Sequence, residues 1–258
     1  MSEGSVHLSR AGRVATLRFD RPLARNAMTW AMYGQLAAHC TQLAQDPQLR
    51  LVVLRGAGGE AFVAGTDIAQ FQDFQGGEDG VAYERRIDEG IALIERLPMP
   101  TVAVIEGWAV GGGLAIATAC DFRIATPSAR LGVPIARTLG NTLSMANLAR
   151  LQAAFGTQRL KRMLVLAELL DAEEALACGF LHEVCAAEAL DAALARLSDR
   201  LLALAPVTQA VVKEGLRRLV AEQLPEGEDL IRRCYGSQDF REGVAAFTAR
   251  RAPAWQGV

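Results

Sequence analysis

The sequence contains few of the residues and motifs that mark whole classes of enzyme. Its three histidines, His7, His39 and His182, lie far apart, and its five cysteines form no Cys-x-x-Cys pair. It therefore has no spacing typical of a zinc site or a dithiol redox centre. It also lacks a Gly-x-Ser-x-Gly elbow, a Walker lysine loop and a His-Glu-x-x-His pair. Catalysis by a metal ion or by a serine nucleophile has no support in the sequence.

An excess of one charge sign and a long apolar run are absent as well. The chain has 27 Lys and Arg against 29 Asp and Glu, a net charge of −2, so it lacks the basic field that holds nucleic acid. No apolar run approaches the roughly 20 residues that cross a bilayer, and residues 1–10 contain no signal-peptide core. We therefore predict a cytoplasmic protein with buried, reduced thiols and with neither nucleic acid nor membrane as a partner.

What is present is the pattern of an α/β protein. The chain has 258 residues, 51% of them hydrophobic, which is enough for a large core. Strand-like runs occur at 14–19, 51–55, 101–105 and 121–125. Helical segments separate them, such as 83–97, which places Ile87, Ile91 and Ile94 on one face. Strands that alternate with helices predict crossover connections and mostly parallel pairing.

The second half of the chain has a different pattern. After residue 144 the periodicity is almost wholly helical. A leucine seam consists of Leu190, Leu194, Leu197, Leu201 and Leu204. It spans too few heptads to predict a coiled coil. We expect an α/β core over residues 1–200, which would hold the site, and a helical region over residues 201–258.

Two glycine-containing segments, 61–68 and 105–115, each follow a strand-like run. A glycine-rich turn that opens into a helix exposes unpaired backbone N–H groups. Two such groups directed at one carbonyl oxygen would form an oxyanion hole. On these segments alone, close packing of a helix on a strand is the better explanation of Gly111 to Gly113.

Two other features suggest chemistry less strongly. Residues 56–61 fit Gly-x-Gly-x-x-Ala after a strand, but the residues that follow do not open an amphipathic helix with a ribose-binding acid about twenty residues further on. We interpret this segment as a loop. Asp67 and Asp121 are better explained as residues that fix a loop or a neighbouring arginine than as acid–base groups.

Six segments in order resemble the enoyl-CoA hydratase/isomerase (crotonase) family. Besides the two glycine segments, they are Arg21 to Ala27 (Arg-Pro-Leu-Ala-Arg-Asn-Ala), Cys120 to Ala125, Leu131 to Pro134, and Ser237 to Phe247 with Arg250, Arg251 and Trp255. The resemblance covers nearly the whole chain. It implies an α/β crotonase (ClpP-like) fold, a spiral of β-β-α turns with a C-terminal helical trimerisation region, and a homotrimer or a dimer of trimers.

The resemblance also implies site residues. The backbone N–H groups of Thr66 and Gly112 would form the oxyanion hole for a thioester carbonyl. The expected substrate and coenzyme A contacts are Leu23, Ala24, Ala64, Gly65, Thr66, Asp67, Ile68, Gly111, Ile135 and Arg250. Arg250 or Arg251 would meet the phosphates of coenzyme A, although a solvated helix end explains them equally well. Coenzyme A would arrive as part of the substrate, with no permanently bound cofactor and no metal.

The chain departs from the family at the proton carriers. Hydratases of the family use two glutamates, and their positions here are Ala115 and Ile135, which cannot exchange a proton. The substitute candidates are Arg137, Thr138, Asn141 and Ser144, with Glu89 as a distant base. Arg137 cannot act as a base and would suit an acyl carboxylate, while Asn141 would orient a water. Alternatively, Arg137 pairs with a neighbouring carboxylate and Asn141 caps the following helix.

The sequence therefore predicts an acyl-CoA enzyme, nominally catalysing enoyl-CoA hydration or dehydration as in fatty-acid β-oxidation. Two alternatives remain. One is a weakly active or inactive coenzyme A-binding homologue that serves as a regulatory or scaffold subunit. The other is a specialised crotonase with a different enolate reaction on a polar acyl-CoA.

Overall fold

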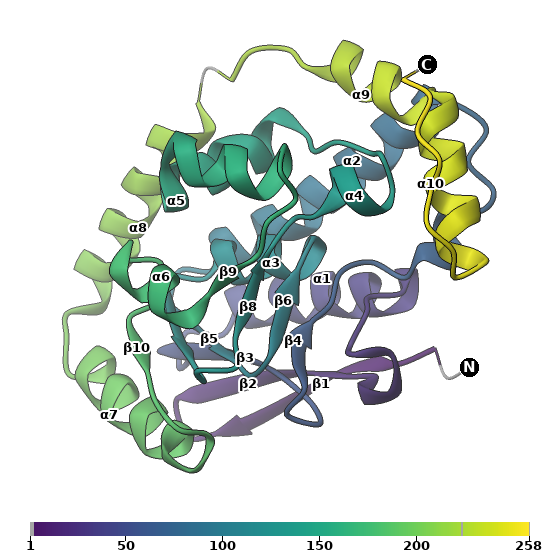
Figure 1. The fold of residues 1–258 in the computed structure, drawn as a ribbon. Helices are drawn as coiled ribbons and strands as arrows, with labels where there is room; N and C mark the ends of the chain where they lie inside the picture. The colour runs from purple at the N-terminus through teal and green to yellow at the C-terminus, as the bar shows by residue number, and fades with distance from the viewer. Residues whose placement is uncertain (1–2, 223, 258) are drawn as a thin grey trace.

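The computed structural model describes residues 3–222 and 224–257, which build two sheets surrounded by helices (Figure 1). The larger sheet has six strands in the order β1-β2-β3-β5-β7-β10 and the smaller has four in the order β4-β6-β8-β9. The strands of the larger sheet are β1 Ser5–Ala11, β2 Val14–Asp20, β3 Leu51–Gly56, β5 Thr101–Ile105, β7 Phe122–Ala125 and β10 Glu183–Val184. Those of the smaller sheet are β4 Ala61–Val63, β6 Trp108–Val110, β8 Arg130–Gly132 and β9 Leu170–Asp171.

The chain repeats one unit along its first half. A strand of the larger sheet is followed by a strand of the smaller sheet and then by a helix, as in β3-β4-α2 and β5-β6-α3. The helices of this part are α1 Trp30–Ala44, α2 Gly77–Glu95 and α3 Gly112–Ala119. This arrangement confirms the predicted spiral of β-β-α turns, and it brings the segments after β4 and β6 to the same edge of the smaller sheet.

Strand pairing is mostly parallel, as predicted. The chain from β2 through β3, β5 and β7 to β10 pairs in parallel throughout. The exceptions are the β1–β2 hairpin and the β8–β9 pair, which are antiparallel. The hairpin was not predicted, because Ser5–Ala11 alternates too weakly to be distinguished from a polar leader.

Four leucines of the seam pack on the larger sheet, whereas Leu204 lies beyond helix α7, Leu190–Leu202, and is exposed. Helix α7 buries Leu190, Leu197 and Leu201 against a face formed by Leu51, Val53, Val102, Val104 and Ile124. This separate hydrophobic cluster covers the outer face of the sheet, while the main core fills the inner face. Burial of one such leucine stabilises the fold by about 2 kcal/mol.

The C-terminal helices separate into two groups. Helix α8, Pro206–Ala221, exposes an apolar row of Val207, Val211, Val212, Leu216 and Leu219. Helices α9, Glu228–Tyr235, and α10, Gln238–Thr248, fold back, α9 against α2 and α10 against the short helices η2, Ile68–Phe71, and α4, Ile135–Thr138. The last two helices therefore form part of the wall around the edge where the glycine segments meet (Figure 1).

The remaining helices are η1 Pro22–Ala24, α5 Met145–Leu164, α6 Ala172–Ala177 and η3 Ala187–Ala189. All five cysteines are free; Cys40 and Cys120 are buried, and the other three are only partly buried, which corrects the expectation that all are buried. Within the described residues, no helix combines the length and apolarity needed to span a membrane.

Candidate active site

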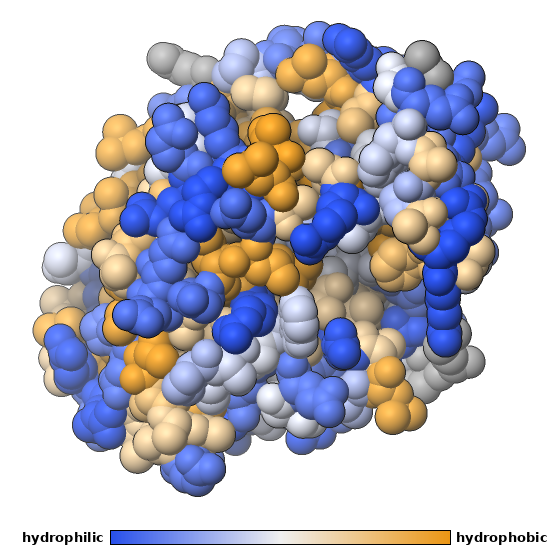
Figure 2. All heavy atoms as spheres, viewed as in Figure 1, coloured by the Kyte–Doolittle hydropathy of each residue, from blue (hydrophilic) through white to orange (hydrophobic). Residues whose placement is uncertain are grey.

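A cavity of about 820 Å³ lies where the glycine segments, α2, α4 and α10 meet. In Figure 2 hydrophobic residues gather near the centre of this face with hydrophilic residues around them. Every residue expected from the family resemblance to contact substrate or coenzyme A lines this cavity, and Thr66, Gly112 and Asn141 line it too. Arg137 is the exception. It lies exposed on α4, outside the lining, so the cation suggested for an acyl carboxylate is not in the cavity.

Different structural features account for the three glycines at the start of α3. Gly111 has a φ of 55°, in the left-handed region that favours glycine. A β-carbon at Gly113 would lie 1.9 Å from the carbonyl oxygen of Val63, so close packing on β4 explains this residue. Gly112 is the first residue of the helix, and its N–H has no acceptor among residues 3–222 and 224–257. Packing therefore accounts for one glycine and leaves the donor at Gly112 available.

Thr66 follows β4 and supplies a second free backbone N–H. Its neighbours Gly65 and Asp67 form the bridge to Met28, whereas the Thr66 N–H has no acceptor in the described part of the chain. A β-carbon built on Gly112 would lie 3.9 Å from the Thr66 nitrogen, so the two residues that carry the free N–H groups are close neighbours. The pair thus has the composition of an oxyanion hole.

The Thr66 side chain is held by two tyrosines. Its hydroxyl shares hydrogen bonds of 2.8 Å with the hydroxyls of Tyr33 and Tyr83. Burial raises the pKa of Tyr33 to about 12, so this phenol stays protonated. The hydroxyl therefore fixes the loop, while the N–H remains directed elsewhere.

The Arg21 to Ala27 turn forms another part of the cavity rim. The guanidinium of Arg21 pairs with Asp67 at 2.7 Å, and Asn26 bridges three backbone groups. Asn26 accepts from the Arg21 N–H and donates to the carbonyl oxygens of Ala57 and Ala61. The ion pair between Arg21 and Asp67 supports the structural interpretation of Asp67.

Asp121 lies far from the cavity and pairs with Lys213 at 2.7 Å. The loop interpretation of residues 56–61 is confirmed, since these residues connect β3 to β4.

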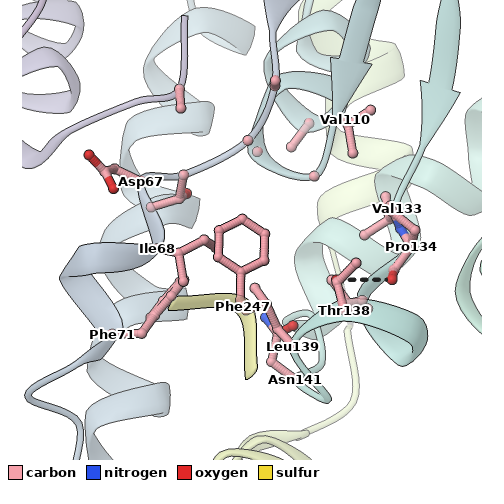
Figure 3. Close-up of a pocket in the computed structure, with 18 of the residues that line it drawn as sticks. Asp67, Ile68, Phe71, Val110, Val133, Pro134, Thr138, Leu139, Asn141 and Phe247 are labelled. Carbon is pink, nitrogen blue, oxygen red and sulfur yellow. Dashed lines mark hydrogen bonds between the residues drawn. The ribbon is translucent and has the colours of Figure 1, made fainter. Parts of the chain in front are cut away.

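The acyl end of the cavity is largely apolar. Ala115 and Ile135, where the family resemblance predicts the two glutamates, both line it, together with Val133 and Leu143. Figure 3 shows the ring of Phe247 from α10 between Ile68 and Leu139. Thr138 donates its hydroxyl proton to the carbonyl oxygen of Pro134 at 3.1 Å (Figure 3). None of these side chains can carry a proton to or from carbon.

Besides Asp67, a second carboxyl group lines the cavity. Glu84 on α2 is 2% exposed and accepts hydrogen bonds from the Tyr235 hydroxyl at 2.8 Å and from the Ser144 N–H at 2.9 Å. Burial raises the pKa of Glu84 to about 7 against the lowering effect of these bonds. Asn141 donates to the Tyr235 hydroxyl at 3.1 Å, and Ser144, rather than Asn141, caps α5.

Glu84 was missed at the sequence level, where Glu89 was named on the same helix. Glu89 is exposed and lies outside the cavity. The pattern contained a usable signal, because Glu84 falls three residues before Ile87 and therefore on the buried face of α2. Tyr235 gave no comparable signal, because only the return of α9 onto α2 brings it to the site.

The basic residues of the C-terminal segment border the cavity mouth. Arg250 and Arg251 both line it. Arg251 is paired with Glu242 at 2.5 Å, whereas Arg250 forms no ion pair with any described residue. Leu23 is fully exposed on the other side of the mouth.

Comparisons with known proteins agree over the whole length. A family model described as enoyl-CoA hydratase/isomerase matches residues 9–258. The crotonyl-CoA hydratase of Syntrophomonas wolfei is 29% identical over 257 residues, covering 97% of both chains. A solved enoyl-CoA hydratase/carnithine racemase from Magnetospirillum magneticum is 31% identical with a TM-score of 0.80, covering 100% of this chain and 97% of that one. Methylmalonyl-CoA decarboxylase in complex with 2-nitronate-propionyl-CoA is 26% identical with a TM-score of 0.89, covering 98% of both chains.

Proposed function

This chain belongs to the enoyl-CoA hydratase/isomerase family, and we propose that it stabilises the enolate of an acyl-CoA thioester between the backbone N–H groups of Thr66 and Gly112. The observation that carries the proposal is the pair of adjacent, unpaired N–H groups at one cavity. Negative charge that develops on the thioester oxygen would be stabilised there by two fixed donors.

The cavity walls suggest how the substrate lies. The pantetheine arm would pass between Leu23 and Ala64, with the coenzyme A phosphates near Arg250 at the mouth. The acyl group would point toward Ile135 and Leu143. Because Arg137 lies outside this space, it would supply no cation for an acyl carboxylate.

The nominal reaction is enoyl-CoA hydration and its reverse, dehydration. Ordinary hydration of this kind uses two proton-exchanging groups, and neither Ala115 nor Ile135 is one. We therefore expect slow turnover of crotonyl-CoA, or a reaction in which one carboxyl group suffices.

Decarboxylation of a malonyl-type thioester is the second candidate. Two observations favour it: the TM-score of 0.89 to a methylmalonyl-CoA decarboxylase, and alanine and isoleucine where two carboxylates would repel a substrate carboxylate. Loss of carbon dioxide forms the enolate without a base, so the two N–H groups would supply most of the catalysis.

The exposed row on α8 suggests the assembly. We propose that a second and a third copy of the chain cover Val211, Leu216 and Leu219, giving a trimer or a dimer of trimers. Sedimentation analysis of the wild type and of Leu216→Glu tests this, since one buried charge should dissociate the assembly.

The test of the enolate proposal is turnover of crotonyl-CoA and methylmalonyl-CoA, with calorimetric binding of coenzyme A on the same sample. Gly112→Pro removes the N–H, while Gly112→Ala adds the same β-carbon, 2.6 Å from the Tyr33 hydroxyl, and keeps the N–H. We expect Gly112→Pro to lose about a hundredfold to a thousandfold more activity than Gly112→Ala. Equal losses would contradict the oxyanion role, and binding without any turnover would favour the scaffold alternative.

A further inference from the structure

A buried carboxyl group in the cavity has no part in the proposed enolate chemistry. Among residues 3–222 and 224–257, Glu84 is the only Asp or Glu in the lining besides Asp67, and Asp67 is already paired with Arg21. The lining around Glu84 includes Ile87, Leu143 and Leu151, which are apolar. A carboxyl group in such surroundings is costly to ionise and is rarely placed there without a partner.

No cation compensates the Glu84 carboxylate. Among the residues that the structure describes, no Lys, Arg or His forms an ion pair with it; Arg150 on α5 instead pairs with Asp88 and Glu95. Its oxygens accept from the Tyr235 hydroxyl, the Ser144 N–H and the Asn147 side chain. A carboxylate has about four acceptor positions, so one position remains for a substrate proton.

The helix itself connects Glu84 to the N–H pair. Tyr83, the preceding residue, is bonded through its hydroxyl to Thr66, and both residues line the same cavity. The Tyr83–Glu84 step of α2 is therefore fixed beside the loop that supplies the Thr66 N–H. A thioester bound at that N–H would extend its acyl carbons along the wall to which Glu84 belongs.

We propose that Glu84 is the catalytic proton carrier of this site, in place of the glutamates that positions 115 and 135 lack; the assignment rests on the proposed enolate function. The carboxylate takes a proton from the α-carbon of the acyl group. The C–H bond breaks, an O–H bond forms on Glu84, and the electron pair moves into the enolate, whose oxygen lies at the Thr66 and Gly112 N–H groups. The reverse step returns the proton to carbon, which also completes a decarboxylation.

Tyr235 is a positioning residue in this scheme. It holds Glu84 through its hydroxyl and is itself held by Asn141. The other groups that face Glu84 are the Ser144 N–H and Asn147 on α5 and Asp88 on its own helix, with Cys234 beside Tyr235 on α9. The raised pKa of Glu84, about 7, leaves it able both to accept and to return a proton near neutral pH.

The experiment follows α-proton exchange of butyryl-CoA in D₂O by NMR. This saturated thioester cannot be hydrated, so exchange reports only enolate formation. Glu84→Gln preserves the shape and can still accept from Ser144, and Glu89→Gln makes the same change at an exposed position of the same helix. We expect Glu84→Gln to lose at least about a hundredfold in exchange rate, with butyryl-CoA affinity retained, and Glu89→Gln to match the wild type.

The outcomes separate the two proposals. Exchange by Glu84→Gln at the wild-type rate would overturn the role of Glu84 and leave the enolate function standing. Absence of exchange in the wild type would also overturn the role of Glu84, and the enolate function would fall with it only if crotonyl-CoA and methylmalonyl-CoA are not turned over either. Tyr235→Phe provides a reading that a purely structural role would not give: removing this hydrogen bond should move the rise of the exchange rate to higher pH while leaving measurable exchange there. An unshifted pH profile would contradict the link between Tyr235 and Glu84.

Discussion

The two ends of the cavity are built from different parts of the chain. At the proposed thioester end the functional atoms would be the backbone N–H groups of Thr66 and Gly112, which follow β4 and begin α3. At the proposed acyl end they would be side chains, and the family resemblance places its two glutamates at Ala115 and Ile135, which both line the cavity. A backbone donor survives a change of side chain, whereas a proton carrier disappears with one substitution. On the proposed function, the chain would retain the general part of the chemistry and change the specific part.

The largest expected effect comes from restoring the acyl end. Both Ala115→Glu and Ile135→Glu place a carboxylate in the existing cavity, and the double variant should hydrate crotonyl-CoA at least about a hundredfold faster than the wild type. The measurement is loss of enoyl thioester absorbance. No gain would mean that the two ends are not aligned as in a hydratase, which would favour the decarboxylase candidate.

A second effect concerns stability. Because the pKa of Glu84 is raised from 4.5 to about 7, the folded protein holds an extra proton between these pH values. The cost of burying the charge is absent below about pH 4.5 and complete above about pH 7. Glu84→Gln should therefore raise the free energy of unfolding by up to about 3 kcal/mol at pH 8 and by less than about 1 kcal/mol at pH 5.

Urea unfolding of both proteins at the two pH values measures this difference. Glu89→Gln serves as the control and should change neither value by more than about 0.5 kcal/mol. An equal effect of Glu84→Gln at pH 5 and pH 8 would mean that Glu84 has an ordinary pKa in the folded protein.

The smallest expected effect sharpens the comparison at the thioester end. Thr66→Ala keeps the N–H and loses the two hydrogen bonds to Tyr33 and Tyr83. We expect turnover within about tenfold of the wild type and a loss of stability of about 1–2 kcal/mol. Steady-state kinetics measure the turnover and thermal unfolding measures the stability. A loss of turnover as large as that of Gly112→Pro would show that the threonine hydroxyl takes part in the chemistry.

The sequence predicted the backbone part of the site better than the side-chain part. The glycine segments and the Arg21 to Ala27 turn carry their geometry locally, in positive φ angles and short-range hydrogen bonds, so their motifs could be recognised. Glu84 and Tyr235 meet across 151 positions of sequence, through the packing of α9 on α2. Arg137 was a candidate because its segment passes the cavity, but its helix turns that side chain outward. A local sequence pattern identifies the segment that borders the cavity, but only tertiary packing determines where its side chains point.

The return of the last two helices has a practical consequence. Tyr235 on α9 and Phe247 on α10 come from the final part of the chain, yet they close the wall around a carboxyl group that is translated far earlier. A protease cut or a truncation before α9 would leave both sheets intact and open Glu84 to water, where its pKa would fall toward the ordinary carboxyl value. Such a fragment would keep most of the secondary structure, so circular dichroism would not reveal the loss of the Tyr235 hydrogen bond to Glu84.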